Sequence, residues 1–294
     1  MKKIAFAIIA CLTIILQSCT PKSTADIESQ YIENDEIKIH YKTYGEGNNT
    51  IVFIHGIGCD MRAWDHQVKD LCKDYRLVFI DLPGHGLSDK PETEYTLDFY
   101  ARSIKKVVDE LHIDKATFVG HSLGTPICRQ FYFNYPEKVS GLCDIDGVYC
   151  FYPTDTIFTE AYRASLEDFV SLFKEDDYKH NMIQFVKSLS YVTTPKEVCD
   201  YAMDNMPELP QKIAYSTLYN LIDRKYWTGQ KISVPTLIFC SQNSDLPPDN
   251  YEKMGNLYSN MQYLEFNDIG HFIMMENPKL FNTEFRKWLE KNIN

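Results

Sequence analysis

The sequence predicts an α/β protein with a mainly parallel central sheet, helices on both faces of the sheet and an inserted helical lid. Two observations predict the sheet. Short apolar runs alternate with stretches whose apolar residues recur at helical spacing, and several runs end in glycine, histidine, serine or aspartate. A third observation predicts the lid, because the alternation stops at residue 148 and the next apolar run begins at residue 233.

The first strands differ in their hydrophobic pattern. Residues 36–44 alternate apolar and polar side chains, which predicts a half-buried strand at the edge of the sheet. Residues 51–54 are all apolar, as in a central strand that is covered on both faces. A helix over about 62–71 and a second buried strand over 76–80 follow.

The next elements repeat this alternation. Between residues 97 and 111 the apolar side chains recur every three or four positions, which predicts an amphipathic helix. A strand over 116–119, a helix over 125–135 and a strand over 139–145 come next. This order of strand and helix predicts that neighbouring strands lie parallel.

The last part of the chain resumes the pattern after the insertion. Strands are expected over 233–240 and 261–266, and helices over about 249–257 and 278–292. In parallel sheets of this kind, ligands bind beyond the carboxyl ends of the strands. The residue types that carry chemistry follow such strand ends, so the sequence predicts one site there.

The domain division follows from these elements. Residues 31–147 and 232–294 are expected to form the core, and residues 148–231 the lid. Most of the many aromatic side chains in the lid are expected to pack within the lid and against the core, and a few to line an apolar pocket. The predicted partner is therefore a small-molecule substrate with an apolar acyl or aryl group.

The N-terminus has the pattern of an export signal. Lys2 and Lys3 precede an apolar stretch that is too short to span a bilayer comfortably, and residues 1–18 are therefore expected to be a signal peptide. The segment around Cys19 resembles a bacterial lipoprotein signal, which implies lipidation of Cys19 and a tether over 19–30. The alternative is an ordinary secretory signal. Either interpretation predicts an exported protein, and the first predicts attachment to a bacterial membrane in the cell envelope.

Composition excludes some other classes. The formal net charge of −11 gives no electrostatic support for binding nucleic acid. Nine cysteines are present, but there is no C-x-x-C pair and the histidines are not grouped with them. We therefore expect no metal site and no cofactor, and a disulfide is permitted by export without being required.

The stretch Gly120-His121-Ser122-Leu123-Gly124 carries the strongest chemical signal. It joins a predicted strand to a predicted helix, which is the context of a G-x-S-x-G nucleophile elbow. A serine oxygen at such a turn is exposed and rigidly held, and the flanking glycines remove Cβ atoms that would clash. Ser122 is the predicted nucleophile.

Two further residues complete the predicted catalytic group. His271 follows the final strand and a glycine, and its imidazole would accept the proton of Ser122 and return it to the leaving group. The acid that orients the imidazole is predicted to be Asp245, which follows the strand 233–240. Asp146, at the end of strand 139–145, is the alternative acid.

With these motifs in order, the sequence resembles the α/β-hydrolase superfamily over about residues 36–292. The resemblance is carried by four motifs: HGIG at 55–58, DLPGHGLSD at 81–89, GHSLG at 120–124 and GH at 270–271. It implies the α/β-hydrolase fold and an oxyanion hole formed by the backbone N–H groups of Ile57 and Leu123.

Four residues within or directly after these motifs are candidate substrate-pocket residues: His55, Gly56, Cys59 and His121. The segment 81–89 contains a GxG that lacks the spacing and the lysine of a phosphate-binding loop, and we interpret it as a structural turn.

Two classes of function remain. The first is a serine hydrolase that cleaves an ester, thioester or amide of a carboxylic acid through an acyl-enzyme, with a carboxylic ester favoured. A carbon–carbon bond hydrolase and an aminopeptidase use the same catalytic group and stay open. The second class is a non-catalytic binding protein of the cell envelope. Labelling of Ser122 by a fluorophosphonate discriminates between the two classes, because it requires an activated serine.

Overall fold

An eight-stranded sheet forms the centre of the protein in a computed structural model, which describes residues 27–33, 37–147, 156–241 and 250–293. The order of strands across the sheet is β1-β2-β4-β3-β5-β6-β7-β8. The strands β3 to β8 lie parallel, whereas β1 and β2 run antiparallel to their neighbours. The bounds are β1 (Gln30–Glu33), β2 (Lys38–Tyr44), β3 (Thr50–Ile54), β4 (Arg76–Ile80), β5 (Ala116–His121), β6 (Val139–Ile145), β7 (Thr236–Ser241) and β8 (Met261–Phe266). The predicted fold class is confirmed.

One prediction about the sheet was wrong. The sequence predicted an edge strand over residues 36–44, and β2 lies within this range. However, β1 pairs with the outer side of β2, with Gln30 opposite Tyr41, so β1 is the edge strand. Because β1 is short and its side chains are partly or wholly exposed, its sequence carries no burial pattern that would distinguish it from a tether. Tyr41 and Ile39 of β2 are buried accordingly.

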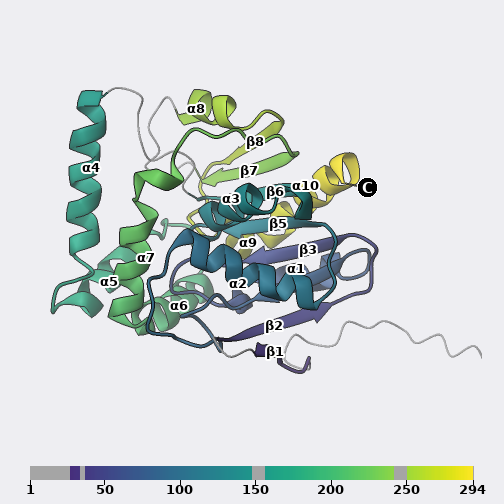
Figure 1. The fold of residues 1–294 in the computed structure, drawn as a ribbon, viewed down its shortest axis with the longest axis horizontal. Helices are drawn as coiled ribbons and strands as arrows, with labels where there is room; N and C mark the ends of the chain where they lie inside the picture. Colours follow the sequence, from purple (N-terminus) through teal and green to yellow (C-terminus); the bar gives the residue numbers. More distant parts are fainter. Residues whose placement is uncertain (1–26, 34–36, 148–155, 242–249, 294) are drawn as a thin grey trace, which may run out of the picture.

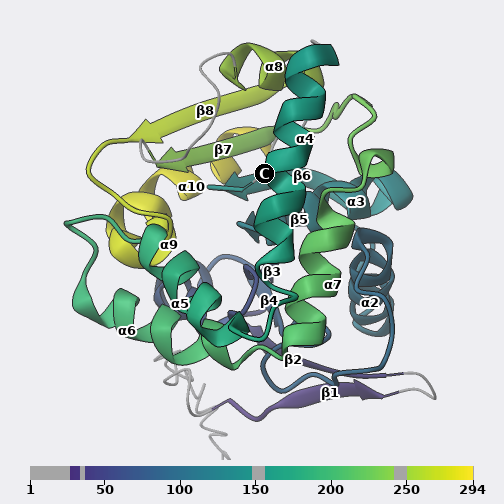
Figure 2. The ribbon, with the colours of Figure 1, turned by 90° about the vertical axis from the view of Figure 1, so that its left-hand side faces the viewer.

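Helices cover both faces of the sheet (Figures 1 and 2). On one face, α2 packs against α3, and α3 packs on β5 and β6. On the other face lie α9 and α10 (Figure 2), and α1 packs against both of them. The bounds are α1 (Asp65–Leu71), α2 (Leu97–Glu110), α3 (Gly124–Asn134), α8 (Asn250–Leu257), α9 (Ile273–Glu276) and α10 (Pro278–Asn292).

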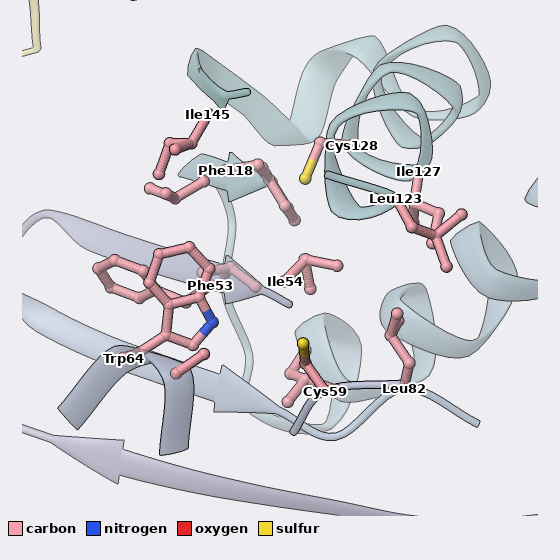
Figure 3. Close-up of a cluster of buried hydrophobic side chains, with 14 of the residues drawn as sticks. Phe53, Ile54, Cys59, Trp64, Leu82, Phe118, Leu123, Ile127, Cys128 and Ile145 are labelled. Atoms are coloured by element: carbon pink, nitrogen blue, oxygen red, sulfur yellow. The ribbon is translucent and has the colours of Figure 1, made fainter. Parts of the chain in front are cut away.

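The core lies between the sheet and these helices (Figure 3). Phe53 of β3 packs against Trp64 and Phe79, with ring centroids 5.2 and 4.8 Å apart. All three rings are almost fully buried, and burying one side chain of this size contributes about 1.5–3 kcal/mol. Cys128 lies in the same cluster as a free thiol, so here a cysteine serves as a small apolar side chain.

Between β6 and β7 the described chain is helical. It forms α4 (Thr156–Ser171), α5 (Tyr178–Ser188), α6 (Lys196–Asn205) and α7 (Gln211–Leu221). These helices lie over the end of the sheet at which the parallel strands finish (Figure 2), and we refer to them as the lid. Any ligand beyond the strand ends would therefore contact both the core and the lid.

The predicted signal peptide and Cys19 lie outside the described residues. Across the ranges that the structure describes, no helix combines the length and apolar character needed to cross a membrane.

Candidate active site

Ser122 occupies a strained turn between β5 and α3. Its φ of 52° is in the left-handed region, which side chains rarely adopt. A Cβ atom on Gly120 would lie 2.4 Å from the carbonyl carbon of Gly124, and one on Gly124 would lie 2.2 Å from the carbonyl oxygen of Ile54. The turn therefore depends on both glycines. The Ser122 N–H donates to the carbonyl of Ile145 at 2.9 Å, which fixes the serine beside the end of β6.

The imidazole of His271 is held by a buried carboxylate. His271 Nδ1 lies 2.8 Å from Asp146 Oδ2, and the side chain of Asp146 is only 3% exposed. Because an ionised carboxylate only accepts, Nδ1 carries the proton and donates it. The second ring nitrogen, Nε2, is then unprotonated and can accept a proton.

Asp146 is itself fixed from the next strand. Its Oδ1 accepts the N–H of Ser241, the last residue of β7, at 2.8 Å, and the Ser241 hydroxyl lies 3.0 Å from Oδ2. The backbone of Asp146 has a φ of 41°, a second left-handed residue at a strand end. Asp245, the first choice of acid from the sequence, lies outside the described residues. The structure thus brings the alternative acid, Asp146, to His271.

Ser122 and His271 line the same cavity without a direct hydrogen bond. Within the described residues, no hydrogen bond joins Ser122 Oγ to the imidazole. Catalytic hydrogen bonds are often long in ligand-free enzymes and shorten when substrate binds. The Ser122 hydroxyl is therefore free to turn towards Nε2 of His271.

Two backbone N–H groups beside Ser122 are free. Ile57 and Leu123 line the cavity with Ser122, and neither N–H donates to another group in the described part of the chain. Such unpaired donors beside a nucleophile can stabilise an oxyanion. The position of Ile57 follows from the close approach of its loop, because a Cβ atom on Gly56 would lie 3.1 Å from Ser122 Cβ.

The cavity itself is apolar and has a volume of about 240 Å³. Apart from the residues at the strand ends, its walls come from the lid helices α4, α5 and α7 and the residues that follow them. The lid residues that line it are Leu166, Phe169, Val170, Phe185, Leu189, Leu218, Leu221 and Ile222. None of the described lid residues that line these walls is charged, and the surface they present suits an uncharged apolar group.

The four other predicted pocket residues are not among the described residues that line this cavity. His55 and Gly56 lie in the loop after β3, where His55 Nδ1 donates to the Gly56 carbonyl at 2.8 Å and Nε2 accepts the Leu82 N–H at 3.0 Å. Burial lowers the pKa of His55, which keeps the ring neutral. Cys59 lines a separate cavity of about 490 Å³, and burial raises the pKa of its thiol to about 12.

His121 has a role that the sequence did not indicate. Its Nε2 donates to the backbone carbonyl of His271 at 3.0 Å, and the two ring centroids are 4.6 Å apart. Burial holds the pKa of His121 well below its usual value, with the neighbouring His271 acting in the same direction. A neutral His121 can therefore support His271 without placing a second positive charge beside it.

The segment 81–89 is a turn braced by one carboxylate. Asp81 accepts the N–H groups of Met61 and Leu87 at 2.8 and 2.9 Å and pairs with His40. His85 Nδ1 donates to the Pro83 carbonyl at 3.1 Å. In the part of the chain that the structure describes, no group of three histidine, cysteine, aspartate or glutamate side chains is placed to hold a metal ion.

Comparisons with known proteins agree with this architecture. A family model described as the alpha/beta hydrolase fold matches residues 49–278. The chain is 27% identical over 275 residues to the dihydrolipoyllysine-residue acetyltransferase component of the acetoin cleaving system of Cupriavidus necator, covering 88% of this chain and 68% of that protein. It is also 27% identical over 266 residues to 2-hydroxy-6-oxononadienedioate/2-hydroxy-6-oxononatrienedioate hydrolase 1 of Pseudomonas putida, covering 84% and 90%. A solved structure described as Est816, an N-acyl homoserine lactone degrading enzyme, superposes with a TM-score of 0.73 at 25% identity and covers 88% of this chain and 99% of that one.

Proposed function

The chain belongs to the alpha/beta hydrolase fold family, and from that premise we propose that it is a serine hydrolase acting on a carboxylic ester through an acyl-enzyme. The observation that carries the proposal is the contact between His271 and the buried carboxylate of Asp146, in the same cavity as Ser122. Two free N–H groups in that cavity supply the remaining requirement of acyl transfer.

The proposed reaction has two steps. Ser122 Oγ attacks the ester carbonyl while His271 Nε2 accepts its proton, and the N–H groups of Ile57 and Leu123 stabilise the oxyanion. His271 then gives the proton to the leaving alcohol, and an ester bond joins the acyl group to Ser122. In the second step His271 takes a proton from water, which attacks this ester, and the carboxylic acid leaves as Ser122 is reprotonated.

We propose Asp146 as the acid, in place of Asp245. The 2.8 Å hydrogen bond to His271, the burial of the carboxylate and its fixation by Ser241 all support this role. Such a carboxylate holds the imidazole in one tautomer and stabilises the imidazolium that forms during each step.

The apolar walls of the cavity support an uncharged acyl group. A volume of about 240 Å³ suits a short aliphatic chain or a single aromatic ring better than a long fatty acyl chain. The solved structure described as degrading N-acyl homoserine lactones, at 25% identity, is consistent with an ester substrate that carries an apolar chain.

A carbon–carbon bond hydrolase is the second candidate. The Pseudomonas putida relative is named as a hydrolase of a hydroxy-oxo-dienedioate, and the alignment covers 84% of this chain. That substrate name describes a dianion, whereas the described lid residues that line the cavity are all apolar. We therefore favour the ester.

The test uses a protein that begins at Thr20 and a series of p-nitrophenyl esters of increasing acyl length. We expect hydrolysis that depends on acyl length, and we expect Ser122→Ala to lower kcat by about 10⁴-fold or more. Labelling by a fluorophosphonate should disappear in the same variant. Ester hydrolysis that survives Ser122→Ala would refute the proposal, and labelling without any ester hydrolysis would favour the carbon–carbon bond hydrolase.

We also propose that Cys19 carries a lipid anchor, on the basis of the sequence around it. The test is fractionation of cells that produce the full chain or its Cys19→Ala variant. We expect the full chain in the membrane fraction and the variant outside it, and an equal distribution of the two would refute the anchor.

A further inference from the structure

Two loops carry His271 and Ile57, two of the residues in the proposed catalytic machinery, and both loops contact the same part of the lid. The histidine loop (residues 268–272) contains His271, and the oxyanion loop (residues 55–60) contains Ile57. The part of the lid that contacts them is the α6 segment, defined here as residues 189–206. We propose that the α6 segment positions both loops, directly through Tyr201 and through its contact with Glu276 of α9. Tyr201 and Glu276 are thus positioning residues, and this inference rests on the proposed function.

Glu276 supports the histidine loop from both sides of His271. Its Oε2 accepts the N–H of Gly270 at 2.9 Å, and its Oε1 accepts the N–H of Phe272 at 3.1 Å. These two residues are the chain neighbours of His271. The carboxylate of Glu276 therefore fixes the backbone from which the imidazole projects.

The lid completes this arrangement through Thr194. The Thr194 hydroxyl donates to Glu276 Oε2 at 2.9 Å and accepts the N–H of Tyr191 at 2.8 Å. The backbone of the lid also reaches the loop directly, because the His271 N–H donates to the carbonyl of Leu189 at 3.2 Å. The histidine loop is thus bonded to the lid as well as to Glu276.

All three partners of Glu276 are donors. Two backbone N–H groups and one hydroxyl approach its two oxygens, and only a carboxylate offers acceptors on both sides. A glutamine at this position would present an NH₂ group to at least one of these donors. The geometry therefore requires the acid and not only a polar side chain of that length.

Tyr201 of α6 holds the oxyanion loop in a similar way. Its hydroxyl accepts the N–H of Asp60 at 3.1 Å and donates to the carbonyl of the same residue at 3.2 Å. The two backbones also approach closely, since a Cβ atom on Gly58 would lie 2.8 Å from the Cα of Met206. Gly58 has a φ of 68°, so this approach fixes the loop immediately after Ile57.

The two contacts are linked across α6. The ring of Tyr201 meets the ring of Phe272 edge to face, with centroids 6.4 Å apart. The cavity beside Ser122 is the proposed site of the acyl group, and we call it the acyl cavity. Most of the lid residues that line it belong instead to α4, α5 and α7 or directly follow α7. The lid therefore has two separable effects on catalysis: α6 acts on the geometry of the catalytic groups, and the other helices act on the fit of the acyl group.

The test compares Glu276→Gln, Tyr201→Phe and Thr194→Val with matched controls. Glu290→Gln and Tyr251→Phe change exposed residues whose side chains form no hydrogen bond with any described residue, and Thr194→Ser keeps the hydroxyl. The assay is kcat and KM on a p-nitrophenyl ester of short acyl length, with active sites counted by fluorophosphonate. A loss of positioning of this kind can lower turnover by about 10- to 100-fold.

We expect Glu276→Gln, Tyr201→Phe and Thr194→Val each to lower kcat per active site by about 10- to 100-fold, with little change in KM. Thr194→Ser should restore most of the loss, which a role in packing alone would not predict. In the proton spectrum, the low-field signal of the His271 Nδ1–H should broaden in Glu276→Gln and persist in Tyr201→Phe. Glu276 accepts hydrogen bonds from the histidine loop, whereas the Tyr201 hydroxyl hydrogen-bonds Asp60 of the oxyanion loop.

The inference is overturned if the three variants match Glu290→Gln and Tyr251→Phe in kcat per active site. It is also overturned if Thr194→Ser loses as much activity as Thr194→Val. Failure of the proposed function looks different, because the wild-type protein would then show no hydrolysis that depends on Ser122.

Discussion

Replacing Asp146 by asparagine should trap His271 in the wrong tautomer. Asp146 Oδ1 accepts a backbone N–H from Ser241 at 2.8 Å, and Oδ2 accepts the Nδ1–H of His271 at 2.8 Å. The Ser241 N–H can only donate, so in the variant the amide oxygen stays with it and the NH₂ group faces His271. Nδ1 must then accept a hydrogen bond, so the ring proton moves to Nε2.

The size of the effect follows from this change of tautomer. An imidazole with its proton on Nε2 cannot accept the proton of Ser122, and a substitution of this kind in a serine hydrolase lowers kcat by about 10⁴-fold. That factor corresponds to about 5 kcal/mol of transition-state stabilisation. The fold should survive, because the hydrogen bond to Ser241 is kept.

The assay is hydrolysis of p-nitrophenyl butyrate at neutral pH, with Asp245→Asn measured beside Asp146→Asn. Thermal unfolding of both variants checks that the chain is folded. We expect the large loss only in Asp146→Asn. A loss of about 10⁴-fold in Asp245→Asn, together with an active Asp146→Asn, would refute the reasoning and assign the acid to Asp245.

Three further predictions concern the pocket, the pH dependence and the backbone. Phe169→Ala should shift the preferred ester to longer acyl chains, with kcat/KM rising about fourfold for each methylene that newly fits, measured across the ester series. Burial raises the pKa of the Asp144 carboxyl to about 7, so the folded protein holds this proton more tightly than the unfolded chain does. The free energy of unfolding should therefore fall as pH rises from about 4 towards 7, and Asp144→Asn should flatten this decline in urea titrations. Gly58→Ala places a side chain at a φ of 68° and against Met206, and it should lose at least about 1–2 kcal/mol of stability and much of kcat; an unchanged urea midpoint would contradict this.

Local patterns were enough to predict most of the sheet and the strand, turn and helix around Ser122, the proposed nucleophile. The strand and helix around Ser122 are encoded within a few residues, and the observed β5 (Ala116–His121) and α3 (Gly124–Asn134) flank it as expected. The same holds for β3, β4, β6 and β8, whose apolar runs are continuous or end in a clear turn. Strand β1 has no such run, and for this reason the sequence did not reveal it.

The partners of His271 could not be derived in this way. Asp146 and Asp245 each follow a strand in the sequence, and spacing does not decide between them. The support for Asp146 is its hydrogen bond to His271, which lies 125 residues further along the chain. His121 is similar: its neighbour within the motif is Ser122, yet its hydrogen bond is to the carbonyl of His271, 150 residues away. Contacts of this separation are determined by the packing of the whole sheet.

Glu276 left a signal in the sequence that can be explained in physical terms. Helix α9 begins after Phe272, so the N–H groups near its start need acceptors from outside the helix. Glu276 lies in the first turn of α9 and accepts the N–H of Phe272, the residue before the helix, which resembles a capping box. The added hydrogen bonds to Gly270 and Thr194 connect this local cap to the histidine loop and to the lid, and neither bond can be predicted from sequence spacing alone.

The apolar contacts of the lid around the cavity and its hydrogen bonds to the two loops place different constraints on the lid. The lid residues that line the cavity beside Ser122 present apolar surfaces to it. They can therefore change size without unpairing the hydrogen bonds that hold His271 and Ile57. The α6 segment has less freedom, since its hydroxyl and carbonyl groups hydrogen-bond the backbone of the loops that carry Ile57 and His271. A shift of α6 by the length of one hydrogen bond would unpair several buried groups at once. Substrate preference should therefore respond to substitutions in α4, α5 and α7, while α6 constrains how far the lid as a whole can move.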